Sequence, residues 1–298
     1  MKKFLSMLLL LFLLLIFHEA AIHGAKTGLL LWYQTLIPSL MPFLLITNAL
    51  SETGVYQSVT SHLGHILPCR IYEIIAIFLG NLCGYPIGGK IVNDFVKNDY
   101  LTPYRGNQLL PFSSQASPMF LIGYVHMHIL KNSIPLSIFL LAIYLPIFFL
   151  YPFFVHSSSL TTNHDLENTT KKFNICDTFM HAVQIMVMIG LYVMIFSIAL
   201  EILFPFCNNN ITRILLSFLE ITNGLKLLNT LSLPVSTKIA FICALSSFGG
   251  ICSIFQIRGV LEYKNASMKK YLLDKLILSA GTFLIIQCYL LLSPKTIH

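Results

Sequence analysis

The feature of this sequence that most restricts its fold is a series of apolar runs that approach the length of a membrane-spanning helix. About 20 apolar residues cross the hydrocarbon core of a bilayer as an α-helix. Residues 133–155 (SIPLSIFLLAIYLPIFFLYPFFV) and 271–293 are the plainest such runs. Only 10% of the 298 residues are charged, whereas a soluble domain has about 25%. The sequence therefore predicts an all-α polytopic membrane protein.

About eight membrane segments are expected, and several of them are expected to be broken or re-entrant. They lie near residues 4–22, 28–50, 70–89, 109–130, 133–155, 177–204, 236–257 and 271–293. The first follows Lys2 and Lys3 and is interpreted as a retained helix, because no small-residue cleavage site follows it. Most basic residues lie between apolar runs, so the net charge of +7 indicates loops that face anionic lipid rather than nucleic acid.

Four of these segments contain residues that interrupt a helix. Segment 28–50 contains two prolines, and segment 70–89 ends in GNLCGYPIGGK (80–90). Segment 109–130 begins with LLPFSSQASPMFLIG, and segment 236–257 contains LSSFGGICSIFQ. Polar sequence that loosens the backbone is tolerated at membrane depth only where protein or a water-filled cavity surrounds it. The interruptions therefore predict an internal cavity.

The interruptions occur in a similar order in two halves of the chain. Each half has a helix, an interfacial stretch (55–67 and 211–219), a polar break containing Gly or Asn, and a Ser-Ser pair, and a further interfacial stretch is expected at 91–99. Matching the halves requires gaps, so the relation is weak. The predicted organisation is an N-terminal helix and loop (1–27), a first half (28–155), a polar linker (156–176) and a second half (177–298). Corresponding interruptions in two halves are a pointer to the binding site of a transporter.

The stretch 80–90 has three interpretations. It matches the phosphate-loop pattern GxxxxGK, but Ile91 stands where that loop needs Ser or Thr, and a membrane run precedes it. The glycines alternatively allow two helices to approach closely, with Lys90 reaching the interface. We favour an unwound membrane helix, in which a half-helix beginning near Gly88 directs its positive end and Lys90 at a bound anion.

The matching break in the second half is LEITNG (219–224), which contains Glu220. A carboxylate within a membrane protein is a functional candidate, and the alternative is a glutamate wetted by lipid headgroups. If Glu220 faces the cavity, it either pairs with Lys90 when no solute is bound or carries a proton for coupled transport. The sequence leaves both roles open.

Serine and glutamine side chains in the two Ser-rich segments add neutral hydrogen-bond donors for a solute. The alternative for each serine is a bond to a carbonyl of its own helix. The candidate substrate-binding residues are Asn81, Tyr85, Lys90, Ser113, Ser114, Gln115, Ser117, Glu220, Asn223, Ser246, Ser247 and Gln256. The sequence contains no nucleophile–base pair, carboxylate dyad or metal-binding motif, so we expect neither an enzyme nor a cofactor.

The motifs and their order resemble those of the sporulation integral membrane protein YlbJ family, which is built on the nucleoside-recognition Gate fold. The resemblance rests on LIPSLMPFLLITNAL (36–50), GYPIGGKI (84–91), the Ser-Pro stretch within 114–123, LEITNG, and SFGGICSIFQ (247–256). The segment Ser114-Gln115-Ala116-Ser117-Pro118 departs from the family, where an Asn is expected near the Ser-Pro pair. The resemblance implies an inverted repeat with paired re-entrant hairpins, a role in endospore formation at a cell or forespore membrane, and dipicolinate as cargo.

Two functions from different classes follow from these observations. The first is a multi-pass transporter or facilitator for a small anionic or heteroaromatic solute. The second is a membrane scaffold for spore maturation that carries no solute. The expected partners are the solute and the lipid bilayer, with no nucleic acid. Association with a second copy or with other sporulation membrane proteins is left open, as are the direction and the coupling ion.

Overall fold

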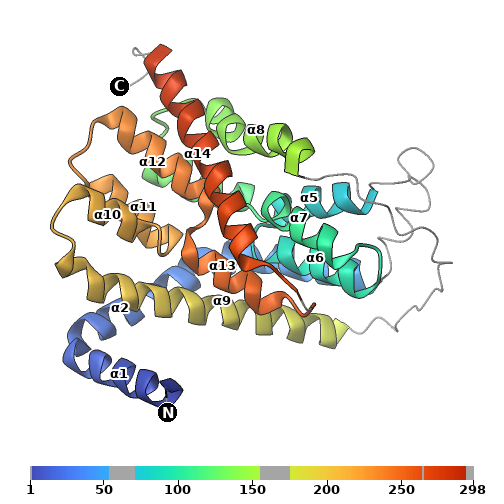
Figure 1. The fold of residues 1–298 in the computed structure, drawn as a ribbon, viewed down its shortest axis with the longest axis horizontal. Helices are drawn as coiled ribbons and strands as arrows, with labels where there is room; N and C mark the ends of the chain where they lie inside the picture. The colour runs from blue at the N-terminus through green and yellow to red at the C-terminus, as the bar shows by residue number, and fades with distance from the viewer. Residues whose placement is uncertain (1, 54–70, 155–174, 264, 293–298) are drawn as a thin grey trace.

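The computed structural model describes residues 2–53, 71–154, 175–263 and 265–292, and in these ranges it contains helices and no strand (Figure 1). Within the same ranges, five helical stretches are long and apolar enough to cross a bilayer: His18–Leu50, Leu136–Phe153, Ile175–Phe206, Val235–Val260 and Met268–Leu292. Large apolar side chains such as Phe148 and Leu284 are exposed on these helices, as expected for surfaces solvated by lipid. The predicted all-α polytopic membrane fold is confirmed.

The N-terminal part of the chain forms α1 (Lys2–Ile16), α2 (His18–Leu31), a π-helical turn η1 (Trp32–Leu36) and α3 (Ile37–Glu52). The predicted segment 4–22 is therefore divided, since α1 ends at Ile16 and α2 begins at His18. The helix α2 crosses α9 closely, because a Cβ added at Gly24 would lie 2.7 Å from the Cα of Ile198. This contact places α2 and α3 beside the second half of the chain.

The first half contains a helical hairpin followed by a broken helix. The hairpin consists of α5 (Ile71–Cys83) and α6 (Ile87–Lys97), and the broken helix consists of α7 (Pro103–Ser113) and η2 (Phe120–Ile129). The predicted break in the stretch 80–90 is confirmed, because α5 ends before Gly84, whose φ of 84° favours glycine. Residues 91–97 of the stretch 91–99 form the end of α6, whose residues 91–96 are mostly buried, so this stretch is not a separate interfacial helix as expected. The apolar helix α8 (Leu136–Phe154) follows.

The second half repeats this arrangement. The long helix α9 (Ile175–Leu203) and the short η3 (Phe204–Phe206) lead to a hairpin of α10 (Asn210–Ser217) and α11 (Ile221–Thr230). The broken helix follows as α12 (Val235–Phe248) and α13 (Gly250–Val260), with α14 (Met268–Leu292) last. Gly249 and Gly250 have φ values of 88° and 81°, a conformation that glycine adopts without steric cost and that separates α12 from α13.

In each half, the turn of the hairpin is hydrogen-bonded to the break in the following helix. Tyr85 N donates to Gln115 O at 3.0 Å in the first half, and Ile251 N donates to Phe218 O at 2.8 Å in the second. These bonds satisfy backbone groups that the helix breaks would otherwise leave unpaired. Residues 156–174 of the predicted linker 156–176 and the predicted interfacial stretch 55–67 lie outside the described residues, and residues 175 and 176 begin α9, so the proposed domain boundaries stay a prediction.

Candidate functional site

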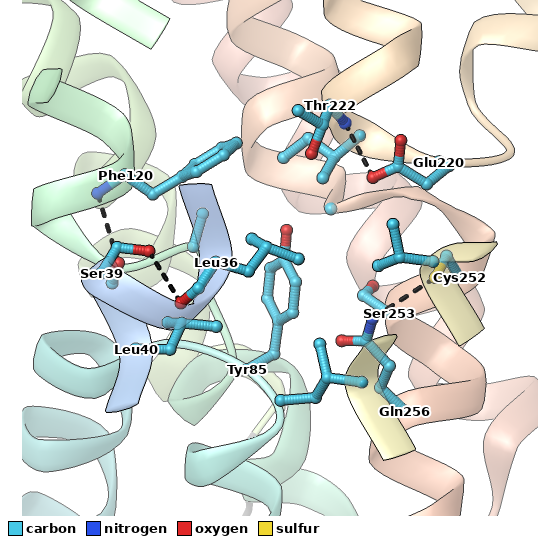
Figure 2. Close-up of a pocket in the computed structure, with 16 residues that line it drawn as sticks. Leu36, Ser39, Leu40, Tyr85, Phe120, Glu220, Thr222, Cys252, Ser253 and Gln256 are labelled. Atoms are coloured by element: carbon cyan, nitrogen blue, oxygen red, sulfur yellow. Dashed lines mark hydrogen bonds between the residues drawn. The ribbon is translucent and has the colours of Figure 1, made fainter. Parts of the chain in front are cut away.

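A small cavity lies where the two hairpin turns and the two helix breaks meet (Figure 2). Its lining residues are Leu36, Ser39, Leu40, Tyr85, Ala116, Ser117, Phe120, Ile189, Val193, Glu220, Ile221, Thr222, Gly249, Cys252, Ser253 and Gln256. The cavity offers about 30 Å³ to the centre of a water molecule, and a single water needs roughly 10–15 Å³ measured in this way. The site is therefore too small for a ring-sized solute in this structure and must widen to admit one.

The turn of the first hairpin places Tyr85 in the cavity. Gly84 packs against the break in the following helix, because a Cβ at Gly84 would lie 2.8 Å from Ser117 N. This close approach brings Tyr85 and Ser117 to the same site. Figure 2 shows the Tyr85 ring between Leu40 on one side and Ser253 on the other. The ring thus separates residues of α3 from residues of the second half.

The turn of the second hairpin places the Glu220 carboxylate in the cavity. Glu220 is the N-cap of α11: Oε1 accepts from Thr222 N at 2.9 Å and Oε2 accepts from Asn223 N at 2.8 Å. Two backbone N–H groups and the positive end of α11 stabilise the carboxylate there. Only 1% of Glu220 is exposed, which favours the cavity position over a position among lipid headgroups.

The structure places Lys90 away from the cavity and from Glu220. Its ammonium group donates to Asn48 Oδ1 of α3 at 2.9 Å and to Asp94 Oδ2 at 3.4 Å. The salt bridge between Lys90 and Glu220 that the sequence suggested is therefore replaced by a bond to α3 and an ion pair within α6. Lys90 ties the first hairpin to α3 in this structure, and its role as an anion ligand stays a prediction.

The twelve candidate residues divide into two groups. Tyr85, Ser117, Glu220 and Gln256 line the cavity, whereas Asn81, Lys90, Ser113, Ser114, Gln115, Asn223, Ser246 and Ser247 do not. Several residues of the second group form hydrogen bonds to other groups of the protein instead. Ser246 Oγ donates to Ile242 O at 2.7 Å, and Asn223 Nδ2 donates to Ser197 Oγ at 2.7 Å. The bond of Ser246 is the intrahelical alternative considered for serine.

Asn81 forms hydrogen bonds near the break that follows α7 and does not line the cavity. Its Nδ2 donates to Ile77 O of α5 and to Phe112 O of α7, both at 2.8 Å. Asn81 also lines a separate, mostly apolar groove that residues of α5 and α8 form. The amide therefore joins the first hairpin to α7, close to the point where α7 ends.

Sequence reasoning missed Lys275, which is fully buried in α14. Its ammonium group donates to Ser114 O at 3.0 Å, Gln115 Oε1 at 2.8 Å and Ser247 O at 2.6 Å. Lys275 thereby brings together three predicted site residues that lie outside the cavity. The available signal was the pair of charged residues Asp274 and Lys275 inside the otherwise uncharged segment 271–293, and such residues in membrane helices are expected to have partners and a function.

The charge of the cavity restricts what it can bind. Glu220 is the charged side chain among the lining residues, and the other polar groups are neutral hydroxyl, thiol and amide groups. No Lys or Arg is among them. An anion that enters the site therefore needs a proton on Glu220 or an accompanying cation, because two unpaired negative charges repel each other strongly in a medium of low dielectric constant.

Comparisons with known proteins support part of the resemblance. No family model and no solved structure matches this chain. A stretch of 120 residues is 23% identical to the sporulation integral membrane protein YlbJ of Bacillus subtilis (strain 168), and it covers 39% of this chain. The chain matches 29% of the length of that protein, so the similarity does not extend to the whole relative or to the Gate fold. Together with the apolar helices, it supports a multi-pass integral membrane protein.

Proposed function

We propose that this protein is a sporulation-associated membrane transporter or facilitator for a small anionic or heteroaromatic solute. The observation that carries the proposal is the cavity at which both hairpin turns and both broken helices converge. In transporters built from broken helices, the solute binds where the helices are interrupted, and the surrounding elements move to expose the site alternately to either side. A cavity too small to hold the solute suits one state of such a cycle.

The lining residues favour a flat, polar solute. Tyr85 and Phe120 offer aromatic faces, and Ser117, Ser253 and Gln256 offer neutral hydrogen-bonding groups. A planar heteroaromatic ring can stack on the two aromatic side chains while its oxygen or nitrogen atoms bond to the serine and glutamine side chains. If the solute is an anion, we expect it to bind together with a proton on Glu220, for the electrostatic reason given above.

The link to sporulation and to dipicolinate is the finer part of the proposal. The similar Bacillus protein is named as a sporulation integral membrane protein, and the family resemblance implies dipicolinate as cargo. Dipicolinate is a planar ring with two carboxylates, so it matches the aromatic faces and neutral donors of the site. Its two charges require that Glu220 be protonated, or that the open state recruit Lys90.

The test is uptake of labelled dipicolinate into liposomes that contain the purified protein, with uridine and a simple dicarboxylate as comparison solutes. Tyr85→Leu removes the aromatic ring and hydroxyl that line the cavity, and Lys269→Ala changes an exposed residue of α14 as a control. Uptake that is lost in Tyr85→Leu and kept in Lys269→Ala supports transport through this cavity. Lys90→Ala, run beside them, tests the predicted anion ligand.

The alternative function is a membrane scaffold that assembles partners for spore maturation. Folded wild-type protein that takes up none of the solutes would contradict transport and favour the scaffold. In that case, Tyr85→Leu would leave the association with partner proteins unchanged. The same purified proteins therefore test both the transporter function and the scaffold function.

A further inference from the structure

Lys275 is a buried cation that forms no ion pair with a carboxylate of the described residues. Its three acceptors are neutral oxygens: two backbone carbonyls and one side-chain amide. A buried charge is costly unless its surroundings compensate it. The compensation here must come from the arrangement of the helices.

The two carbonyls belong to the ends of two interrupted helices. Ser114 is the C-cap of α7, and Ser247 lies in the last turn of α12. The C-terminal end of a helix carries unpaired carbonyls and a partial negative charge. Lys275 therefore joins two negative helix ends, one from each half of the chain, which would otherwise meet unpaired at the centre of the protein.

The two carbonyls also occupy matching positions in the two halves. Ser114 and Ser247 are the second residues of the two Ser-Ser pairs that the sequence aligned. The residues that accept from Lys275 carry further polar atoms: Ser114 Oγ, Ser247 Oγ and Gln115 Nε2 are buried and have no hydrogen-bond partner within the described residues. The cage of three residues around Lys275 therefore includes two hydroxyl oxygens that form no hydrogen bond in the described part of the chain.

Such a cage has the chemistry of a monovalent cation site. In transporters with discontinuous helices, unwound carbonyls and the C-terminal ends of half-helices coordinate the coupling Na⁺. Carbonyl, hydroxyl and amide oxygens are the ligands that such hard cations prefer. At this junction, the chain supplies its own cation from α14.

We propose that the Lys275 ammonium group is a tethered cation that takes the place of a dissociable metal ion at the junction of the two broken helices. It holds the ends of α7 and α12 together without a bound metal. Combined with the proposed transport function, this arrangement means that solute binding does not depend on Na⁺. The stability of the junction is a separate consequence, which holds whether or not the protein transports a solute.

Lys275 is also a positioning residue for the cavity. Gln115, which accepts from Lys275 through its side chain, accepts from Tyr85 N through its backbone oxygen at 3.0 Å. Gly249, two residues after Ser247, also lines the cavity, where a Cβ on it would lie 3.1 Å from the Tyr85 ring. Loss of the ammonium group should therefore loosen the cavity lining at Tyr85 and at Gly249 together.

The experiment replaces the tethered cation by a free one. Lys275→Ala and Lys275→Gln remove the charge, and Lys269→Ala is the control on the same helix. Each purified protein is melted in detergent in the chloride salts of sodium, lithium, potassium and choline at equal ionic strength. We expect both Lys275 variants to have a lower Tm in choline and to recover at least half of the loss in one of the metal salts. The recovery should saturate with salt concentration, as for a ligand that binds only the folded state.

Wild type and Lys269→Ala should show no such difference between choline and the metal salts. Folded Lys275 variants that melt alike in all four salts would overturn the proposal, and so would a wild type that is stabilised as strongly as they are. If neither variant can be recovered in any salt, no metal ion replaces the ammonium group, and the proposal also fails. These results depend on stability alone, so they stand apart from the uptake assay that tests transport.

Discussion

The close contact between the first hairpin and α7 depends on the absence of a side chain at Gly88. A Cβ at this position would lie 1.8 Å from the backbone oxygen of Ser113, well below the 3.0 Å that real Cβ contacts respect. The same oxygen would lie 2.2 Å from a Cβ at Gly80. Since the obstacle is a backbone carbonyl beside the helix break, Gly88→Ala must push α6 and α7 apart.

The expected cost of Gly88→Ala follows from this geometry. Overpacking a well-packed interior costs about 1–3 kcal/mol, and a backbone obstacle places this substitution at the upper end. Alanine recovers only about 1 kcal/mol of helix propensity relative to glycine. A net loss of about 2 kcal/mol, at about 2–4 °C for each kcal/mol, lowers the Tm by roughly 4–8 °C.

The matched control is Gly123→Ala in η2, where an added Cβ would meet no atom within 4 Å. Both proteins are melted in detergent, with unfolding followed by the fluorescence of the single tryptophan, Trp32. Trp32 Nε1 donates to Met186 O, so its environment reports on the contact between η1 and α9. The reasoning would be refuted by a Gly88→Ala protein that melts within 1 °C or so of Gly123→Ala, since a difference that small is less than about 0.5 kcal/mol.

Two further substitutions test the buried charges. Glu220→Gln keeps the shape of the side chain but removes its charge. Uptake driven by an inward proton gradient should therefore be lost, while exchange of internal for external solute persists. Equal loss of both activities would mean that Glu220 does not carry the proton. The second concerns Glu73, which accepts from Arg105 and from Tyr151 where α5, α7 and α8 meet. Arg105→Met should destabilise the protein by about 3–5 kcal/mol, because it leaves the buried Glu73 carboxylate without its ion-pair partner. The double variant Arg105→Met with Glu73→Leu should recover most of that loss. A double variant that is no more stable than Arg105→Met in thermal melts would contradict this reasoning.

The sequence by itself determined the class of the protein and three of the four predicted helix breaks, whereas in segment 28–50 the helix α3 continues through Pro42 and the irregular turn η1 lies before it. Long apolar runs can satisfy their backbone groups in lipid only as helices, and this argument needs no knowledge of the partners. Gly84, Gly249 and Gly250 have positive φ values at the predicted interruptions. These features act over a few neighbouring residues, so the local sequence is sufficient to predict them.

The tertiary structure alone decided which polar residues meet at each break. Ser117 reaches the cavity whereas Ser113 does not, although both belong to the same motif. Lys90 bonds to Asn48, which is 42 positions away. Lys275 bonds to Ser114, which is 161 positions away. Such pairs depend on how separate helices pack. A single buried hydrogen bond between distant residues contributes little energy and produces no repeating sequence pattern from which it could be predicted. In the sequence, the buried Lys275 was therefore one residue of a predicted membrane span, and only the fold brought its three oxygen partners to it.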